Sequence, residues 1–262
     1  MSTPNAPEEV TVHTEGGVAT VVFNRPQARN AMTWAMYQQL SNHCQNLKAD
    51  VSVRAVVFRG AGGQAFVAGT DIEQFKTFST GEDGVAYEAK IEACIDLLCS
   101  LPMPTIALIE GWAVGGGLAI ATACDFRVAT PDSQLGVPIA KTLGNCLSVV
   151  NVAHLCSAFG PQRVKRMLML AEMIGADEAM ACGYLHQLAA TDEIDAATAA
   201  LVQRLIALAP VTQHVSKQTL SRLVQHSAPE AEDLIRQAYG SEDFREGVDA
   251  FVAKRKPLWK GR

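Results

Sequence analysis

The first half of the chain alternates short apolar runs with amphipathic segments. The β-branched run 18–23 ends at the turn Asn24–Pro26 and predicts a strand, and the run 53–58 predicts a second one. Between them, apolar residues recur at helical spacing over 33–47, with Thr33 as the expected N-cap. Strands that alternate with helices indicate βαβ units around a mostly parallel, buried sheet.

A third unit of the same kind follows. Residues 87–98 have a helical pattern, two prolines stop it, and a strand is predicted at 105–110. The apolar run continues to a glycine triplet at 115–117, after which small residues predict another helix. A further strand is predicted at 126–129.

Strand signals become rare in the second half of the chain, beyond about Pro138. Helical patterns there cover 148–183, 193–225 and 229–254. We therefore expect an α/β core over residues 1–200 and a helical C-terminal segment over residues 201–262.

The composition fits a globular protein of one large domain, or of a domain and an appendage. The chain has 262 residues, of which 48% are hydrophobic, and it carries a formal charge of −5 with a pI near 5.7. This acidic balance argues against a nucleic-acid or anionic-membrane partner. No apolar stretch reaches the roughly 18–20 residues of a membrane span.

Cysteine and histidine usage favours a reducing compartment and no metal. The seven cysteines are odd in number, include no Cys-x-x-Cys pair and lie mostly among apolar neighbours, so we expect reduced thiols. The six histidines have no metal-ligand spacing. Residues 1–9 are polar and acidic without a signal-peptide pattern, so we expect a cytoplasmic protein.

The glycine triplet 115–117 is the first candidate for chemistry. It joins a buried strand to a helix, and the first N–H groups of a helix have no intrahelical acceptor and carry the positive end of its dipole. Such groups stabilise negative charge on a carbonyl oxygen, and glycine lets a substrate come close. Close packing of helix on strand is the alternative explanation for the glycines.

Four segments carry a family resemblance. They are Asn-Arg-Pro-Gln-Ala-Arg-Asn-Ala-Met at 24–32, Gly-Gly-Gln-Ala-Phe-Val-Ala-Gly-Thr-Asp-Ile at 62–72, the glycine segment at 111–125, and the tail 245–262. In order and spacing they resemble the crotonase (enoyl-CoA hydratase/isomerase) superfamily, over roughly residues 15–262. The resemblance implies a crotonase-like spiral of ββα and βαβ units, with C-terminal helices that form a trimer, often paired into a hexamer. It also implies an acyl-CoA thioester substrate and no cofactor beyond the CoA moiety.

The resemblance implies specific site residues. In the family, two backbone N–H groups form an oxyanion hole around the thioester carbonyl oxygen, and the matching residues here are Thr70 and Gly116. Fixed donors of this kind hold an enolate oxygen without reorganisation. The positions that the resemblance assigns to CoA are Arg29, Ala68, Asp71, Ile72, Gly115, Phe251 and Lys254.

Some of these CoA positions have simpler explanations. Arg29 suits a phosphate contact, but a solvated loop arginine fits the sequence as well. Phe251 and Lys254 match positions that touch the nucleotide of CoA, often that of a neighbouring subunit, and otherwise indicate helix packing and a solvated lysine. Asp71 is expected to cap a turn or helix rather than to act as an acid.

The chain departs from the family at two catalytic positions. Hydratases of the family have a glutamate three residues beyond the oxyanion glycine and another in a Gly-x-Pro-Glu segment. The residues here are Ala119 and, in Gly136–Ile139, Ile139. A third acidic position used by other members falls near Ser148 or on Leu147. Water addition needs one group to activate water and one to protonate the α-carbon. The two-glutamate hydration therefore cannot run here unchanged.

Polar residues near the expected pocket are candidates to replace the glutamates. Lys141, Asn145 and Ser148 are the main ones, and a lysine desolvated in an apolar pocket would act as a base. Ser148 is equally a candidate N-cap. Cys146 and His154 are further candidates, and Cys146 also fits a buried small apolar position. Glu88 and Glu92, on the helix before the third strand, are candidates to face the acyl pocket, and a solvated helix face is the favoured alternative.

Three functions remain open. The first is a hydratase-like lyase that acts on an enoyl-CoA. The second is another reaction through an enolate, such as isomerisation, decarboxylation or hydrolysis, since loss of CO₂ generates an enolate without either glutamate. The third is a non-catalytic acyl-CoA binding protein that keeps the oxyanion hole for affinity.

Overall fold

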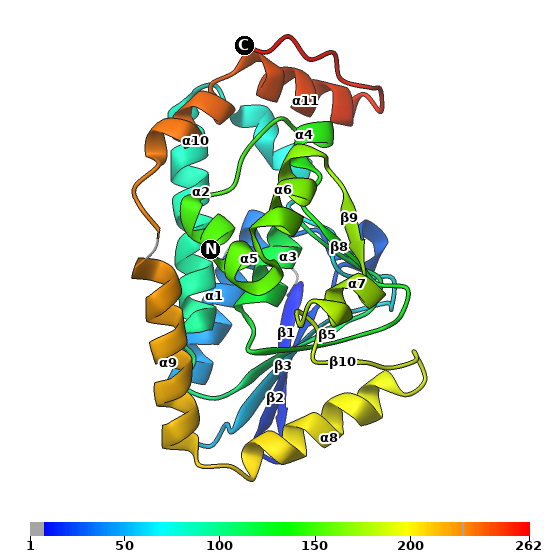
Figure 1. Ribbon diagram of the computed structural model, residues 1–262, viewed down its shortest axis with the longest axis vertical. Helices are drawn as coiled ribbons and strands as arrows, with labels where there is room; N and C mark the ends of the chain where they lie inside the picture. Colours follow the sequence, from blue (N-terminus) through cyan, green and yellow to red (C-terminus); the bar gives the residue numbers. More distant parts are fainter. Residues whose placement is uncertain (1–7, 227) are drawn as a thin grey trace, which may run out of the picture.

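Two β-sheets form the framework of the protein over residues 8–226 and 228–262, the part of the chain that the computed structural model describes (Figure 1). The larger sheet has six strands in the order β1-β2-β3-β5-β7-β10. β1 pairs antiparallel with β2, and the other neighbours in this sheet are parallel. These strands are β1 (Val10–Glu15), β2 (Val18–Phe23), β3 (Ala55–Gly60), β5 (Thr105–Ile109), β7 (Phe126–Ala129) and β10 (Gln187–Leu188).

The smaller sheet has four short strands in the order β4-β6-β8-β9. They are β4 (Ala65–Val67), β6 (Trp112–Val114), β8 (Gln134–Gly136) and β9 (Met173–Gly175). The apolar run before the glycine triplet is thus divided between β5 of one sheet and β6 of the other. Gly111 makes this change of direction, because its φ is +67° and a Cβ there would overlap the carbonyl of Gln64.

The helices of the first half lie where the pattern predicted them, although one of them begins earlier than expected. Thr33 caps α1 (Trp34–Ala49) as expected, with Oγ1 accepting from the N–H of Met36. The predicted helix at 87–98 is longer and forms α2 (Gly81–Cys99), because a capping box of Thr80 and Asp83 starts it earlier. The glycine triplet leads into α3 (Gly116–Ala123), as predicted.

The second half is mostly helical, as the pattern predicted. Two short strands, β9 and β10, interrupt it, and they are too short to leave a periodic signal. The helices are α4 (Ile139–Thr142), α5 (Val149–Phe159), α6 (Pro161–Met169), α7 (Ala176–Ala181), α8 (Ile194–Ile206), α9 (Pro210–His226), α10 (Glu232–Tyr239) and α11 (Glu242–Val252). Two 3₁₀ turns, η1 (Pro26–Ala28) and η2 (Ile72–Thr77), complete the described elements.

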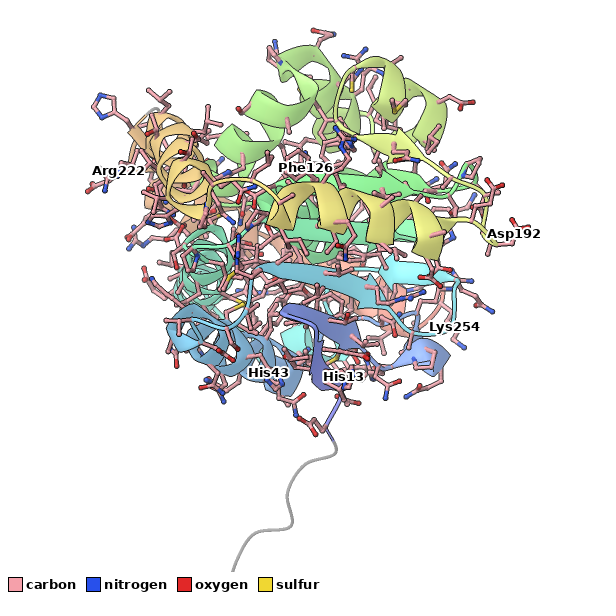
Figure 2. All side chains as sticks on the ribbon, turned by 90° about the horizontal axis from the view of Figure 1, so that it is seen from below. His13, His43, Phe126, Asp192, Arg222 and Lys254 are labelled. Atoms are coloured by element: carbon pink, nitrogen blue, oxygen red, sulfur yellow. The ribbon has the colours of Figure 1, made fainter. Side chains whose placement is uncertain are left out.

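The helix α8 lies across one face of the larger sheet (Figure 2). Its buried residues Leu201, Val202 and Leu205 form a cluster with Ala55 of β3 and Ile106 of β5. The expected division at residue 200/201 falls inside this helix.

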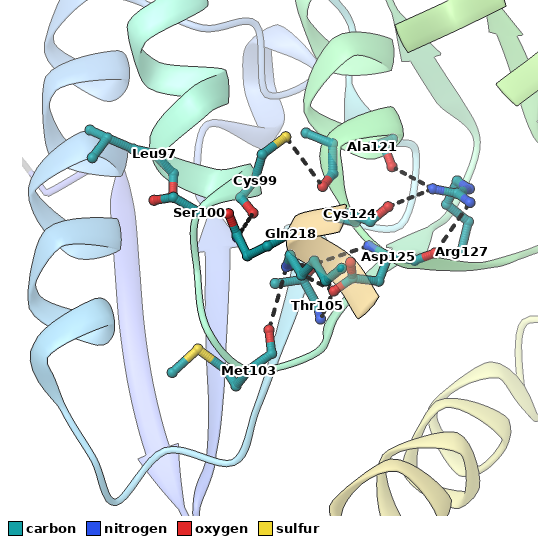
Figure 3. A network of polar contacts seen from close by, with 12 residues as sticks. Leu97, Cys99, Ser100, Met103, Thr105, Ala121, Cys124, Asp125, Arg127 and Gln218 are labelled. Carbon is teal, nitrogen blue, oxygen red and sulfur yellow. Dashed lines mark hydrogen bonds and ion pairs between the residues drawn. The ribbon is translucent and has the colours of Figure 1, made fainter. Parts of the chain in front are cut away.

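A partly buried lysine ties the helix α9 to the polar contacts around Thr105 and Asp125, which Figure 3 shows at the starts of β5 and β7. Lys217 Nζ lies 2.8 Å from the carboxylate of Asp125, which also accepts hydrogen bonds from the N–H and Oγ1 of Thr105. No single helix of the described residues is long and apolar enough to cross a membrane, although α8 and α9 pass that test together across a bend of 104°.

Candidate active site

Five parts of the chain surround a cavity of about 200 Å³. They are the segment after β4, the helix α2, the junction of β6 with α3, the segment around α4, and α11. Each part contributes at least one lining residue, in the same order: Thr70, Glu88, Gly116, Asn145 and Phe251. We call this space the acyl cavity.

Thr70 and Gly116 lie side by side on the wall of the acyl cavity. A Cβ at Gly116 would lie 3.3 Å from Thr70 Oγ1, and one at Gly115 would lie 3.8 Å from the Cα of Gly69. Within residues 8–226 and 228–262, neither the Thr70 N–H nor the Gly116 N–H donates to a protein acceptor. The two loops therefore bring two unused backbone donors to one surface.

The third glycine of the triplet has the packing role that the sequence left open. A Cβ at Gly117 would overlap the backbone carbonyl and the side chain of Val67 on β4. Gly117 is therefore required for the close approach of α3 to the smaller sheet.

Two buried tyrosines flank Thr70, and sequence reasoning missed both. Tyr37 Oη lies 2.8 Å from Thr70 Oγ1, and Tyr87 Oη lies 2.9 Å from the same atom. Burial raises the pKa of Tyr37 and of Tyr87 well above the ordinary range, so both stay neutral hydroxyls. In the sequence they are ordinary apolar positions of two helices, and no local signal separates them from other core aromatics.

Glu88 is the clearest departure from expectation. Instead of facing solvent it is only 2% exposed and lies on the wall of the acyl cavity. The hydroxyl of Tyr239 donates to its Oε1 at 2.6 Å, and the N–H of Ser148 donates to its Oε2 at 2.9 Å. Burial raises the pKa of the Glu88 carboxyl to about 7, although both hydrogen bonds favour the charged form.

The packing of α10 on α2 explains this burial. Tyr239 occupies the space where Gly84, one turn before Glu88, has no side chain. Glycine at this point of an amphipathic helix was the available sequence signal, and it marks where another element comes close.

Three other candidate residues take different positions. Lys141 is exposed and does not line the acyl cavity, so it lacks the desolvation that a basic role requires. Ser148 is buried and caps α5, with its Oγ accepting from the N–H of Asn151 at 3.3 Å. Asn145 lines the cavity and donates from Nδ2 to Tyr239 Oη at 3.1 Å.

The two remaining polar candidates are not part of the cavity wall. Burial raises the pKa of the Cys146 thiol to about 12, so it stays neutral. His154 lines a different cavity, beside Lys217 of α9.

The positions of the two missing glutamates are apolar in the structure as well as in the sequence. Ile139 lines the acyl cavity, and Ala119 is buried in α3. These two positions therefore supply no carboxylate to a substrate.

The residues assigned to CoA fall into two groups. Ala68, Ile72, Gly115 and Phe251 line the acyl cavity. Asp71 caps η2, as expected, by accepting from the N–H of Glu73 at 3.2 Å.

The two basic CoA candidates lie outside the cavity. Arg29 and Lys254 are both exposed, and both have positive φ angles, of 50° and 51°. Figure 2 shows Lys254 at the edge of the molecule.

Asp71 also forms an ion pair of 2.7 Å with Arg25, so its carboxylate already has a charged partner.

Among the described residues, no group of three or more His, Cys, Asp or Glu side chains is arranged to hold a metal ion. All seven cysteines are free thiols, four of them buried.

Comparison with known proteins gives consistent matches. The family described as Enoyl-CoA hydratase/isomerase matches residues 13–262. The short-chain-enoyl-CoA hydratase of Clostridium acetobutylicum is 31% identical over 251 residues, which are 94% of this chain and 95% of that protein.

Two solved structures illustrate the range of relatives. An enoyl-CoA hydratase/carnithine racemase from Magnetospirillum magneticum is 33% identical with a TM-score of 0.79, and the match covers 98% of this chain and 97% of that one. A methylmalonyl-CoA decarboxylase in complex with 2-nitronate-propionyl-CoA is 26% identical with a TM-score of 0.89, and the match covers 98% and 100% of the two chains.

Proposed function

The chain belongs to the enoyl-CoA hydratase/isomerase family, and we propose that it is a hydratase-like acyl-CoA enzyme that stabilises a thioester enolate. The observation that carries this proposal is the pair of unused N–H groups, of Thr70 and Gly116, on the wall of one cavity. They would donate to the thioester carbonyl oxygen as an oxyanion hole. The Gly116 N–H belongs to the first turn of α3, so the helix dipole adds to the stabilisation of negative charge.

The CoA part would extend from this point along the segment that follows β4. We propose that the backbone around Ala68, Asp71 and Ile72 holds the adenine, since two of these residues line the same cavity as Thr70. Arg29 would pair with phosphate from the surface, which suits its exposed guanidinium. Gly115 would give the thioester room, and no cofactor other than CoA is proposed.

We propose that the tail contributes to CoA binding as well. Phe251 supports this, because it is half-exposed and also lines the acyl cavity of its own chain. Lys254 is exposed within one turn of it and would meet a phosphate of CoA in the same chain or in a neighbouring one.

We also propose a homotrimer or a dimer of trimers. Val211 and Val215, four residues apart on one face of α9, are 73% and 56% exposed, which leaves an apolar strip in need of a partner surface.

Hydration of crotonyl-CoA and of longer enoyl-CoAs tests the proposed function, with loss of the enoyl absorbance as the signal. Deuterium uptake at the α-carbon of butyryl-CoA in heavy water tests enolate formation independently of hydration. We expect both reactions above the buffer rate. Binding of these thioesters without either reaction would instead support a non-catalytic acyl-CoA binding protein.

Decarboxylation is the second candidate function. It is favoured by the apolar residues Ala119 and Ile139, because loss of CO₂ from a malonyl-type thioester forms the enolate without a general base. The similarity to methylmalonyl-CoA decarboxylase supports the same candidate. Release of CO₂ from methylmalonyl-CoA, with no hydration of enoyl-CoAs, would decide for it.

A further inference from the structure

Glu88 is the single carboxylate among the described residues that line the acyl cavity. It shares that wall with Thr70 and Gly116, the proposed oxyanion hole. Resting on the proposed function, we infer that the Glu88 carboxyl is the catalytic group that transfers protons to and from the substrate, from a position on α2 that the family motif does not use.

The hydrogen bonds of Glu88 hold the carboxyl in one orientation and leave it reactive. Tyr239 donates to one oxygen and the backbone N–H of Ser148 donates to the other. A carboxylate has about four acceptor sites, so sites remain for a water molecule or a substrate proton. Both donors come from elements other than α2, so contacts with distant parts of the chain set the orientation of the Glu88 side chain.

The surroundings of Glu88 allow both protonation states. No Lys, Arg or His of the described residues forms an ion pair with it, and burial raises the pKa of the carboxyl to about 7. The titratable groups that face it, from the elements packed around it, are Tyr37 of α1, Tyr87 and Glu92 of α2, Cys146 before α5, and Tyr239 of α10. Of these, Glu92 disfavours and Tyr239 favours the charged form.

One carboxyl can complete the hydration. The carboxylate of Glu88 takes a proton from water while the water oxygen forms a bond to the β-carbon of an enoyl-CoA. The electron pair of the double bond moves toward the thioester, and the negative charge collects on the carbonyl oxygen at Thr70 and Gly116. The Glu88 carboxyl then returns the proton to the α-carbon, which gives a 3-hydroxyacyl-CoA and restores the carboxylate.

The same group accounts for the expected deuterium exchange. The carboxylate removes an α-proton from a saturated acyl-CoA, the C–H electron pair forms the enolate, and a deuteron returns to the carbon after the carboxyl has exchanged with heavy water. No oxidant or reductant is needed in either reaction.

Glu88→Gln is the direct test, because glutamine keeps the size of the side chain and an acceptor for the Ser148 N–H. We expect crotonyl-CoA hydration and butyryl-CoA exchange to fall by at least about 100-fold in kcat, while KM and the Kd for butyryl-CoA stay within about threefold. Glu88→Asp should recover part of the loss. Glu92→Gln is the matched control on the same helix, and it should retain kcat within about twofold.

The pH dependence separates proton transfer from a structural role. The acidic limb of kcat/KM for hydration should lie near pH 7, because Glu88 must be deprotonated to activate water. Tyr239→Phe removes a hydrogen bond to the charged form and should move this limb to higher pH. Glu92→Gln removes a neighbouring negative charge and should move it to lower pH.

The outcomes are distinguishable. An active wild-type protein with an equally active Glu88→Gln variant, or with a limb that neither substitution moves, overturns this inference alone. A wild-type protein with no hydration and no exchange overturns the proposed function, and the inference with it. If Glu88→Gln does not fold, the pH profiles of the other two variants test the inference. Movement of the acidic limb to higher pH in Tyr239→Phe and to lower pH in Glu92→Gln supports it, and the absence of both shifts overturns it.

Discussion

Tyr239 packs against Gly84 so closely that a Cβ at the glycine would overlap the tyrosine ring. This contact joins α10 to α2 one turn before Glu88, and it brings the Tyr239 hydroxyl to the Glu88 carboxylate at 2.6 Å. The absence of one side chain thus determines the surroundings of the cavity carboxyl.

Gly84→Ala should therefore destabilise the protein, although alanine is the better helix former. The added methyl group overpacks a buried contact, which typically costs about 1–3 kcal/mol and outweighs the roughly 1 kcal/mol of helix propensity. Urea unfolding measures the net loss, and the acidic limb of hydration should also move. Ala89→Gly, at an exposed position of α2, is the control: it should lower stability and leave the limb in place. A Gly84→Ala protein with unchanged stability would contradict this account of the packing.

Gly116→Ala keeps the backbone N–H but should push it out of place in the proposed oxyanion hole, because the added methyl group clashes with Tyr37. The new methyl group would lie 2.5 Å from Tyr37 Oη and 3.3 Å from Thr70 Oγ1. We expect turnover to fall by about 10²–10³, the usual effect of losing one such donor.

The double variant Tyr37→Phe/Gly116→Ala should regain at least about tenfold, because the nearest remaining ring atom is 3.8 Å away. Gly175→Ala is the control, since its Cβ would lie 3.9 Å from the nearest neighbour. Full activity of Gly116→Ala would contradict the expected displacement of the Gly116 N–H by the contact with Tyr37.

Ser148→Ala should affect stability more than turnover. Loss of the N-cap of α5 costs about 1 kcal/mol, whereas the contact with Glu88 comes from the backbone N–H and persists. We expect kcat within about threefold of wild type and a lower unfolding midpoint. Lys141→Ala, at the surface, should change neither quantity. A tenfold loss of kcat in either variant would restore that residue as a catalytic candidate.

Stability should depend on pH through Glu88. Its pKa rises from 4.5 to about 7 on folding, so the folded state binds more protons between these values and stability falls as pH rises through about 7. Glu88→Gln removes this dependence and should gain stability relative to wild type between pH 5 and pH 8, by up to about 3 kcal/mol. Parallel stability curves for the two proteins would show that Glu88 is not buried as a carboxyl.

Sedimentation should give a particle of three or six times the chain mass of 28.0 kDa. Val215→Glu places a charge on the exposed apolar face of α9 and should shift the protein toward monomer. Gln203→Glu, on the exposed side of α8, is the control and should sediment like the wild-type protein. A monomeric wild-type protein would contradict the proposed assembly.

Local patterns were sufficient for most elements of the fold. The strands at 18–23 and 126–129 and the helix capped by Thr33 follow from β-branched runs, helical spacing and a capping side chain. The strands β9 and β10 escaped prediction because two or three residues cannot establish a period. The division of the apolar run at Gly111 escaped it because a change of sheet leaves the hydrophobic pattern unbroken.

The candidate site also has one part that the sequence predicts and one part that depends on tertiary packing. The sequence alone determined the glycine junction, the cap at Asp71 and the absence of carboxylates at Ala119 and Ile139, because each depends on residue types at short, fixed spacing. Only the tertiary structure decided that Glu88 is buried in the cavity. Its partner Tyr239 lies 151 residues further along the chain, and burial depends on which distant helix covers a face, which the local pattern of that face does not encode.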